Sequence, residues 1–110
     1  MRCYKNHLNQ NLILNAEIYF NLGNEITKLG QFEKAIEIYE KAILTKADYA
    51  YAFVNKGIAL KELKKFNEAL ECYEKAIDLN PDLVEAYCNL GVVQYNLKKL
   101  NDSVESYKKA

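Results

Sequence analysis

The chain repeats a pattern of residues every 34 positions, and this period constrains its fold more than any other feature. Residues 38–57 read IYEKAILTKADYAYAFVNKG, and residues 72–91 read CYEKAIDLNPDLVEAYCNLG. Three kinds of residue recur at this spacing: Tyr39, Tyr73 and Tyr107; Gly23, Gly57 and Gly91; Asn21, Asn55 and Asn89. Because so short a unit cannot bury its apolar side alone, the period predicts stacked copies that share one core.

Each copy is expected to contain two helices. Its apolar residues fall at helical spacing, as in Ala35, Ile36, Tyr39, Ala42 and Ile43. Short turns are expected to separate the two helices at residues 28–31, 63–66 and 97–100. Gly30 suits the left-handed conformation that often ends a helix, whereas Lys64 and Lys98 in the equivalent places predict strain or a different turn.

Gly23, Gly57 and Gly91 fall inside the predicted helices, where glycine costs about 1 kcal/mol relative to alanine. Their recurrence indicates positions where two helices approach closely. Small residues recur on the facing second helices as well: Ala35, Ala42, Ala69 and Ala76.

The repeated residues resemble those of the tetratricopeptide repeat family. Residues 19–43, YFNLGNEITKLGQFEKAIEIYEKAI, and residues 86–110, AYCNLGVVQYNLKKLNDSVESYKKA, share an aromatic–x–x–Leu–Gly start, a small residue in mid-repeat and a late tyrosine. The resemblance implies an all-α, right-handed superhelix (solenoid) of about three helix-turn-helix repeats in one domain. The expected divisions are a degenerate N-terminal helix or cap at 1–15, repeats at 16–49 and 50–83, and a truncated third repeat at 84–110.

Composition and motifs argue against several classes of function. Fifteen basic residues balance fifteen acidic ones, so no net charge favours nucleic acid or membrane partners. The three cysteines have no C-x-x-C spacing, which favours a reducing, cytoplasmic location. His7 is the single histidine, and no nucleophile, phosphate-loop or metal-binding motif is present. We therefore expect a protein that is not an enzyme and needs no cofactor or metal.

The family resemblance implies that the first helices line a concave surface that receives a peptide segment of a partner protein. The residues that would bind the peptide are Asn21, Asn55, Asn89, Phe20, Asn24, Tyr51, Val54, Ile58, Cys88, Val92 and Tyr95.

Two binding mechanisms known in the family can be compared with these residues. A clamp for the acidic tails of heat-shock chaperones needs cations, but the matching positions hold Phe20, Asn24, Asn55, Glu85 and Asn89. An asparagine ladder that holds a peptide backbone, as in O-linked N-acetylglucosamine transferase, matches Asn21, Asn55 and Asn89. The alternative is that these asparagines brace neighbouring helices. The mostly apolar rows beside them predict a largely neutral ligand; the rows are Phe20, Val54 and Cys88, then Asn24, Ile58 and Val92, with Tyr51 and Tyr95 as further aromatic surface.

The leading hypothesis is a non-catalytic scaffold that binds an extended peptide segment. One alternative is a homo-oligomer that forms through the open C-terminal end, because the third copy stops partway through its second helix. The other is a regulatory or substrate-presenting segment of a larger enzyme.

Overall fold

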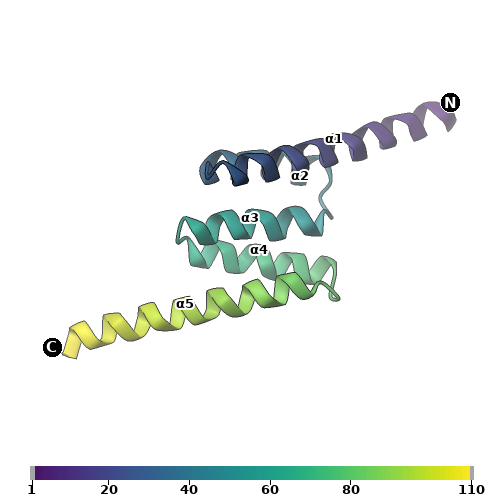
Figure 1. The fold of residues 1–110 in the computed structure, drawn as a ribbon. Coiled ribbons are helices and arrows are strands. Elements are labelled where there is room, and N and C mark those ends of the chain that lie inside the picture. Colours follow the sequence, from purple (N-terminus) through teal and green to yellow (C-terminus); the bar gives the residue numbers. More distant parts are fainter. Residues whose placement is uncertain (1, 110) are drawn as a thin grey trace.

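The computed structural model describes the backbone of residues 2–109 and the side chains of residues 14–101. The described backbone forms helices and no strands, which confirms the all-α expectation. The helices are α1 (Arg2–Lys28), α2 (Phe32–Thr45), α3 (Ala50–Glu62), α4 (Phe66–Leu79) and α5 (Val84–Lys109). Each packs against the next along the chain, and together they form an elongated stack of 70 × 29 × 19 Å (Figure 1).

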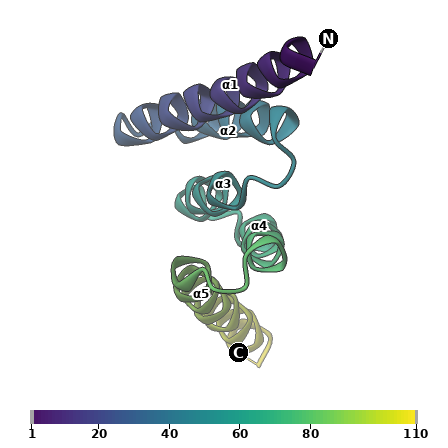
Figure 2. The same cartoon turned by 90° about the vertical axis from the view of Figure 1, so that its right-hand side faces the viewer.

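The stack has two sides. The first helices α1, α3 and α5 contact one another in succession, while α2 and α4 pack behind them. Figure 2 shows α3 and α5 on one side of α4. This is the repeat solenoid that the period predicts, with α1 and α2 as the first repeat and α3 and α4 as the second.

Small residues allow the helices to approach closely. The alanines that recur on the second helices are all fully buried: Ala35, Ala42, Ala69 and Ala76. The largest fully buried side chains are Tyr39, Tyr73, Val54 and Val93. The complete burial of these alanines confirms that the recurring small residues are packing positions. The apolar core to which they belong is the main stabilising contribution to the fold.

The glycines in the first two repeats lie beneath tyrosine rings. A Cβ atom on Gly23 would lie 2.5 Å from Cε1 of Tyr39, and one on Gly57 would lie 2.5 Å from Cε1 of Tyr73. The predicted close approach is therefore confirmed at these two positions. Gly91 differs, because no described atom outside its own stretch of helix backbone lies within 4 Å of the place where its Cβ would be.

Both turns inside the first two repeats use a residue in the left-handed conformation. Gly30 has φ of +77°, as predicted, and Lys64 has φ of +62°, so of the two alternatives expected at Lys64 the structure has the strained conformation and not a different turn. The amide that follows each of these residues donates back into the preceding helix: Gln31 N to Ile26 O at 3.3 Å, and Lys65 N to Leu60 O at 2.9 Å. The two turns are therefore alike, but only the first has glycine, the residue that adopts the left-handed conformation without steric cost.

We expect Lys64→Gly to raise the free energy of unfolding by about 1 kcal/mol, because it removes the steric cost of a side chain in the left-handed region. Urea denaturation followed by circular dichroism measures the change. The matched control is Gly30→Ala, which places a Cβ in the same conformation and should lower stability by a similar amount. Equal or lower stability of the Lys64→Gly protein would contradict this account of the turn.

The two ends of the chain differ from expectation. The turn predicted at residues 97–100 is absent, because α5 continues without a break to Lys109. Residues 2–15, expected to be a degenerate N-terminal helix or cap, are helical and continue without a break into the first helix of the first repeat as α1. The second helices α2 and α4 are each held between two first helices, whereas no later helix of the described chain is available to hold the tail of α5. Lysine is also a good helix former, so Lys98 does not end α5.

Candidate functional site

The contact between the first helices α1 and α3 contains a small hollow of about 150 Å³. Five residues line it: Asn24, Thr27, Tyr39, Asn55 and Ile58. Four of these have polar atoms, although the two repeats around them are otherwise packed through apolar side chains. Asn24, Asn55 and Ile58 are among the residues predicted to bind a peptide, and the structure brings them together here.

A set of hydrogen bonds joins three helices at this hollow. Oδ1 of Asn24, on α1, accepts a hydrogen bond of 2.7 Å from the hydroxyl of Tyr39, on α2. The same oxygen accepts a second bond of 2.7 Å from Nδ2 of Asn55, on α3. Thr27 Oγ1 lies 3.1 Å from the Tyr39 hydroxyl and donates to the carbonyl of Gly23 at 2.8 Å. Burial raises the pKa of Tyr39, and the hydrogen bonds of neighbouring side chains oppose that rise.

The next repeat has a different arrangement at the equivalent positions. Ile58 stands where Asn24 stands in the first repeat, and Lys61 stands where Thr27 stands. The buried hydroxyl of Tyr73 has no hydrogen-bond partner among the described residues, and burial raises its pKa well above the usual value. Lys61 Nζ donates instead to Oδ1 of Asn89 at 3.3 Å. The two repeats therefore share a packing pattern but differ in the polarity of the surface between their helices.

The three recurring asparagines have different environments. Asn21 is exposed, and no hydrogen bond links its side chain to another described residue. Asn55 and Asn89 are half-buried, and each contacts a side chain of the preceding first helix. Asn89 also donates to the carbonyl of Glu85 at 2.9 Å. Two of the three asparagines thus brace neighbouring helices, as the alternative interpretation held.

The predicted apolar rows are only partly exposed. Val54 is fully buried in the core, so its prediction as a peptide-binding residue is wrong. It occupies the same repeat position as Phe20 and Cys88, but α3 is covered by repeats on both sides and α1 and α5 are not. Phe20 is half-buried, with its ring centroid 5.0 Å from that of Tyr49 and 6.2 Å from that of Tyr39. Asn24 and Ile58 are half-buried as well, and four members are exposed to solvent: Tyr51, Cys88, Val92 and Tyr95.

Sequence reasoning missed the part that Tyr39 plays in the hollow. Tyr39 was assigned to the core, and its ring is indeed buried, but its hydroxyl reaches the polar side chains of α1. The sequence contains a sign of this contact, because two polar residues follow the glycine on which the tyrosine packs. Asn24 and Thr27 lie one and four residues after Gly23, the glycine on which the Tyr39 ring packs.

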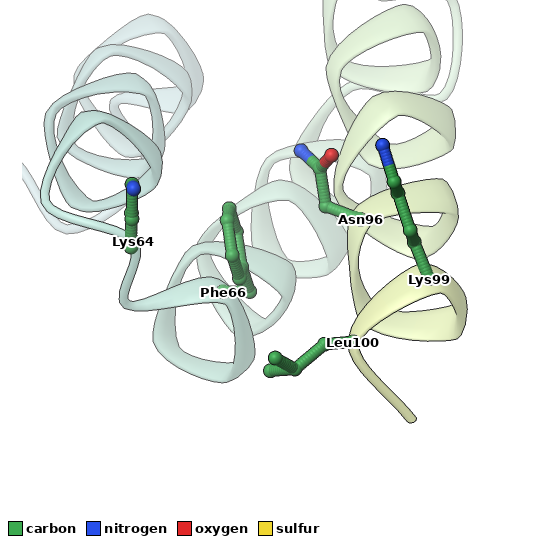
Figure 3. A pocket seen from close by; sticks show the side chains of 5 residues that line it. All are labelled: Lys64, Phe66, Asn96, Lys99 and Leu100. Carbon is green, nitrogen blue, oxygen red and sulfur yellow. The ribbon is translucent and has the colours of Figure 1, made fainter. Parts of the chain in front are cut away.

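A second hollow of about 360 Å³ lies between the α3–α4 turn and α5. Figure 3 shows the side chains that line it: Lys64, Phe66, Asn96, Lys99 and Leu100. Leu100 is 53% exposed, and Lys64 and Lys99 are exposed as well. This hollow marks the place where the C-terminal part of α5 separates from the body of the molecule.

Other kinds of site are not supported within the part of the chain that is described. No group of His, Cys, Asp or Glu side chains there could hold a metal ion. None of the described helices has the length and apolar character needed to cross a membrane. Burial raises the pKa of the Cys72 thiol to about 11, so this thiol stays neutral and behaves as an apolar core residue.

Family models agree with the repeat architecture. The model described as tetratricopeptide repeat matches residues 16–49, and the model described as TPR repeat matches residues 57–98. Together they span most of the chain, so the protein belongs to the tetratricopeptide repeat family. No curated protein matches the chain significantly.

Solved structures show the same fold. The second TPR of Spaghetti (RPAP3) bound to the HSP90 peptide SRMEEVD is 27% identical, with a TM-score of 0.80, and the match covers 93% of this chain and 94% of that one. The TPR2B domain of yeast Sti1 in complex with pHsp70 is 27% identical, with a TM-score of 0.76 and coverage of 84% and 74%. MamA is 30% identical, with a TM-score of 0.74, and the match covers 88% of this chain and 56% of MamA.

Proposed function

We propose that this protein is a non-catalytic scaffold whose first helices α1, α3 and α5 bind an extended segment of a partner protein. The observation that carries the proposal is the polar hollow between α1 and α3, lined by Asn24, Thr27, Tyr39, Asn55 and Ile58. The fold supports it, because similar domains of Spaghetti and Sti1 were solved with chaperone peptides or partners. Repeat modules of this kind are generally interaction modules without catalytic activity.

The chemistry of this surface suits an extended peptide. An amide side chain has both a donor and an acceptor, so it can bind a peptide group without reading the side chains of the peptide. Asn21 is available for this, and Asn55 and Asn89 would have to bind the peptide while they brace their neighbours. The exposed apolar members of the surface would receive side chains of the peptide: Tyr51, Cys88, Val92 and Tyr95, with Ile58 and Phe20 half-buried beside them.

The charges along the surface disfavour an acidic peptide. Glu17 and Glu85 are exposed on the first helices, and a carboxylate near either one would be repelled. Lys61 lies on the same side, where its ammonium group donates one hydrogen bond to Asn89. We therefore propose a largely neutral ligand with apolar anchors, unlike the peptide SRMEEVD held by the Spaghetti domain. We also propose that the protein is cytoplasmic, in line with the free thiols of Cys72 and Cys88.

A peptide selected from a random displayed library should bind with micromolar affinity, and its binding should depend on the first-helix surface. We expect Asn21→Ala and Tyr95→Ala each to weaken binding about 10-fold, because each removes one hydrogen bond or one apolar anchor. Fluorescence polarisation with the labelled peptide measures the change.

The control for this test is Leu44→Ala, which truncates a side chain that is 86% exposed on α2, outside the first-helix surface. It should leave the affinity unchanged. The peptide SRMEEVD serves as a second control and should bind at least about 10-fold more weakly than the selected peptide. Equal effects of Tyr95→Ala and Leu44→Ala, or tight binding of SRMEEVD, would contradict the proposal.

A further inference from the structure

Helix α5 exposes an apolar face that its counterpart in the second repeat buries. We define the α5 seat as Val84, Tyr87 and Gly91. Val84 is 72% exposed and Tyr87 is 48% exposed, and nothing described lies within 4 Å of a Cβ placed on Gly91. On another face, α5 buries Ala86 and Val93, so the seat is a second apolar surface of the same helix.

The equivalent residues of α3 show what belongs on the seat. Ala50 and Phe53 pack against the core, and Gly57 lies under the ring of Tyr73, which α4 supplies. The first repeat uses the same contact, with the ring of Tyr39 over Gly23. The α5 seat therefore has the form that accepts a second helix carrying a tyrosine.

The repeat period identifies that tyrosine as Tyr107. It follows Tyr39 and Tyr73 at the same spacing, and Ser103 and Val104 before it match Ala69 and Leu70 of α4. The segment that fits the seat is thus residues 101–109, the last part of α5 itself.

A continuous α5 cannot bring this segment to its own seat. Residues 91 and 107 are sixteen positions apart on one helix, which separates them by about 24 Å along its axis. Folding back would need a turn at residues 97–100, with Lys98 in the left-handed conformation that Lys64 adopts. That conformation costs a residue other than glycine about 1–2 kcal/mol. Figure 1 shows α5 continuing past α4 with its end away from the body.

We propose that two copies of this chain exchange the ends of α5, so that residues 101–109 of each complete the third repeat of the other. Two α5 helices that lie antiparallel place residue 107 of each opposite residue 91 of the other, with the crossing near residue 99. This pairing is two-fold symmetric, so each copy gives one tyrosine and receives one. The hollow beside Leu100 lies where the helix leaves its own chain for the other (Figure 3).

Light scattering coupled to size exclusion, over a series of concentrations, tests the proposal on the full chain. We expect a dimer, and Tyr107→Ala should raise its dissociation constant at least about 100-fold. The matched control is Tyr51→Ala, which removes an exposed tyrosine from α3 and should leave the dimer unchanged. Lys98→Gly should favour the closed turn and yield monomers with unchanged helicity by circular dichroism.

A mixing experiment separates exchange from other kinds of association. Gly91→Leu fills the seat and Tyr107→Ala removes the ring, so each variant alone should be monomeric. Mixed together, they should form a heterodimer, because the intact seat of one accepts the intact tyrosine of the other. A monomeric wild type at all concentrations, a dimer insensitive to Tyr107→Ala, or failure of the mixture to associate would each overturn the proposal.

Discussion

We expect Gly57→Ala to lower the free energy of unfolding by about 3 kcal/mol, although alanine is the better helix former. The new Cβ would lie 2.5 Å from Cε1, 2.9 Å from Cδ1 and 3.0 Å from Cζ of Tyr73. The ring cannot move aside cheaply, because Tyr73 is fully buried in the core between the second and third repeats. The midpoint of thermal unfolding should fall by 10 °C or more, at about 4–8 °C per kcal/mol for a domain of this size.

Gly91→Ala is the matched control, because the same methyl group meets no described atom within 4 Å. Measured at concentrations where the chain is monomeric, it should raise stability by about 1 kcal/mol through helix propensity. Gly23→Ala should behave like Gly57→Ala, since its Cβ would lie 2.5 Å from the Tyr39 ring. If Gly57→Ala proves neutral, the tyrosine does not pack on the glycine as described, and the basis of the α5 seat disappears as well.

Periodicity predicted the packing of the first two repeats because every copy repeats the same steric requirement. A glycine that costs helix stability recurs only if something needs the space, and the rings of Tyr39 and Tyr73 fill that space. The left-handed turn at Gly30 was predicted as well, whereas at Lys64 the sequence left two alternatives, a strained conformation or a different turn, and the structure has the strained one. These features depend on contacts within one repeat, so the same residues recur in each copy and their recurrence predicts the contact.

Features that depend on neighbouring repeats could not be predicted in the same way. Phe20, Val54 and Cys88 occupy one repeat position, yet they are half-buried, buried and exposed, in that order, because only α3 is covered by repeats on both sides. The turn expected at residues 97–100 failed for a related reason. The second helices α2 and α4 each pack between two first helices, and this contact between repeats is not visible in the period of a single copy.

The polarity of the surface between the first helices differs between the first and second repeats, although the packing beneath it is the same. Asn24 and Thr27 in the first repeat become Ile58 and Lys61 in the second, and with these two differences the tyrosine hydroxyl beneath loses its partners. Because the packing pattern is the same while these positions differ, each repeat has a first-helix surface of its own polarity. The hydrogen-bonded hollow of the first repeat should therefore contribute to stability as well as to binding.

We expect Asn24→Ala to lower the free energy of unfolding by about 2 kcal/mol, because it removes the acceptor of two hydrogen bonds at once. The Tyr39 hydroxyl and the Asn55 amide both donate to Asn24 Oδ1 at 2.7 Å. Urea denaturation measures the loss. Asn21→Ala is the control on the same helix; it removes an exposed asparagine and should change stability by less than about 0.5 kcal/mol.

Phenylalanine substitutions at the two tyrosines show whether hydrogen bonding causes this loss. Tyr39→Phe should cost about 1 kcal/mol in the native sequence and much less when combined with Asn24→Ala, since the bond to Asn24 is then already gone. Tyr73→Phe should be neutral or stabilising, because the hydroxyl it removes is buried without a partner. Equal costs at the two tyrosines would mean that the Tyr73 hydroxyl has a hydrogen-bond partner in solution. The two repeats would then not differ in the way the structure shows. A cost at Tyr39 alone would instead mean that the polar hollow stabilises the junction of α1, α2 and α3, so that a bound peptide would have to compete with these hydrogen bonds or add to them.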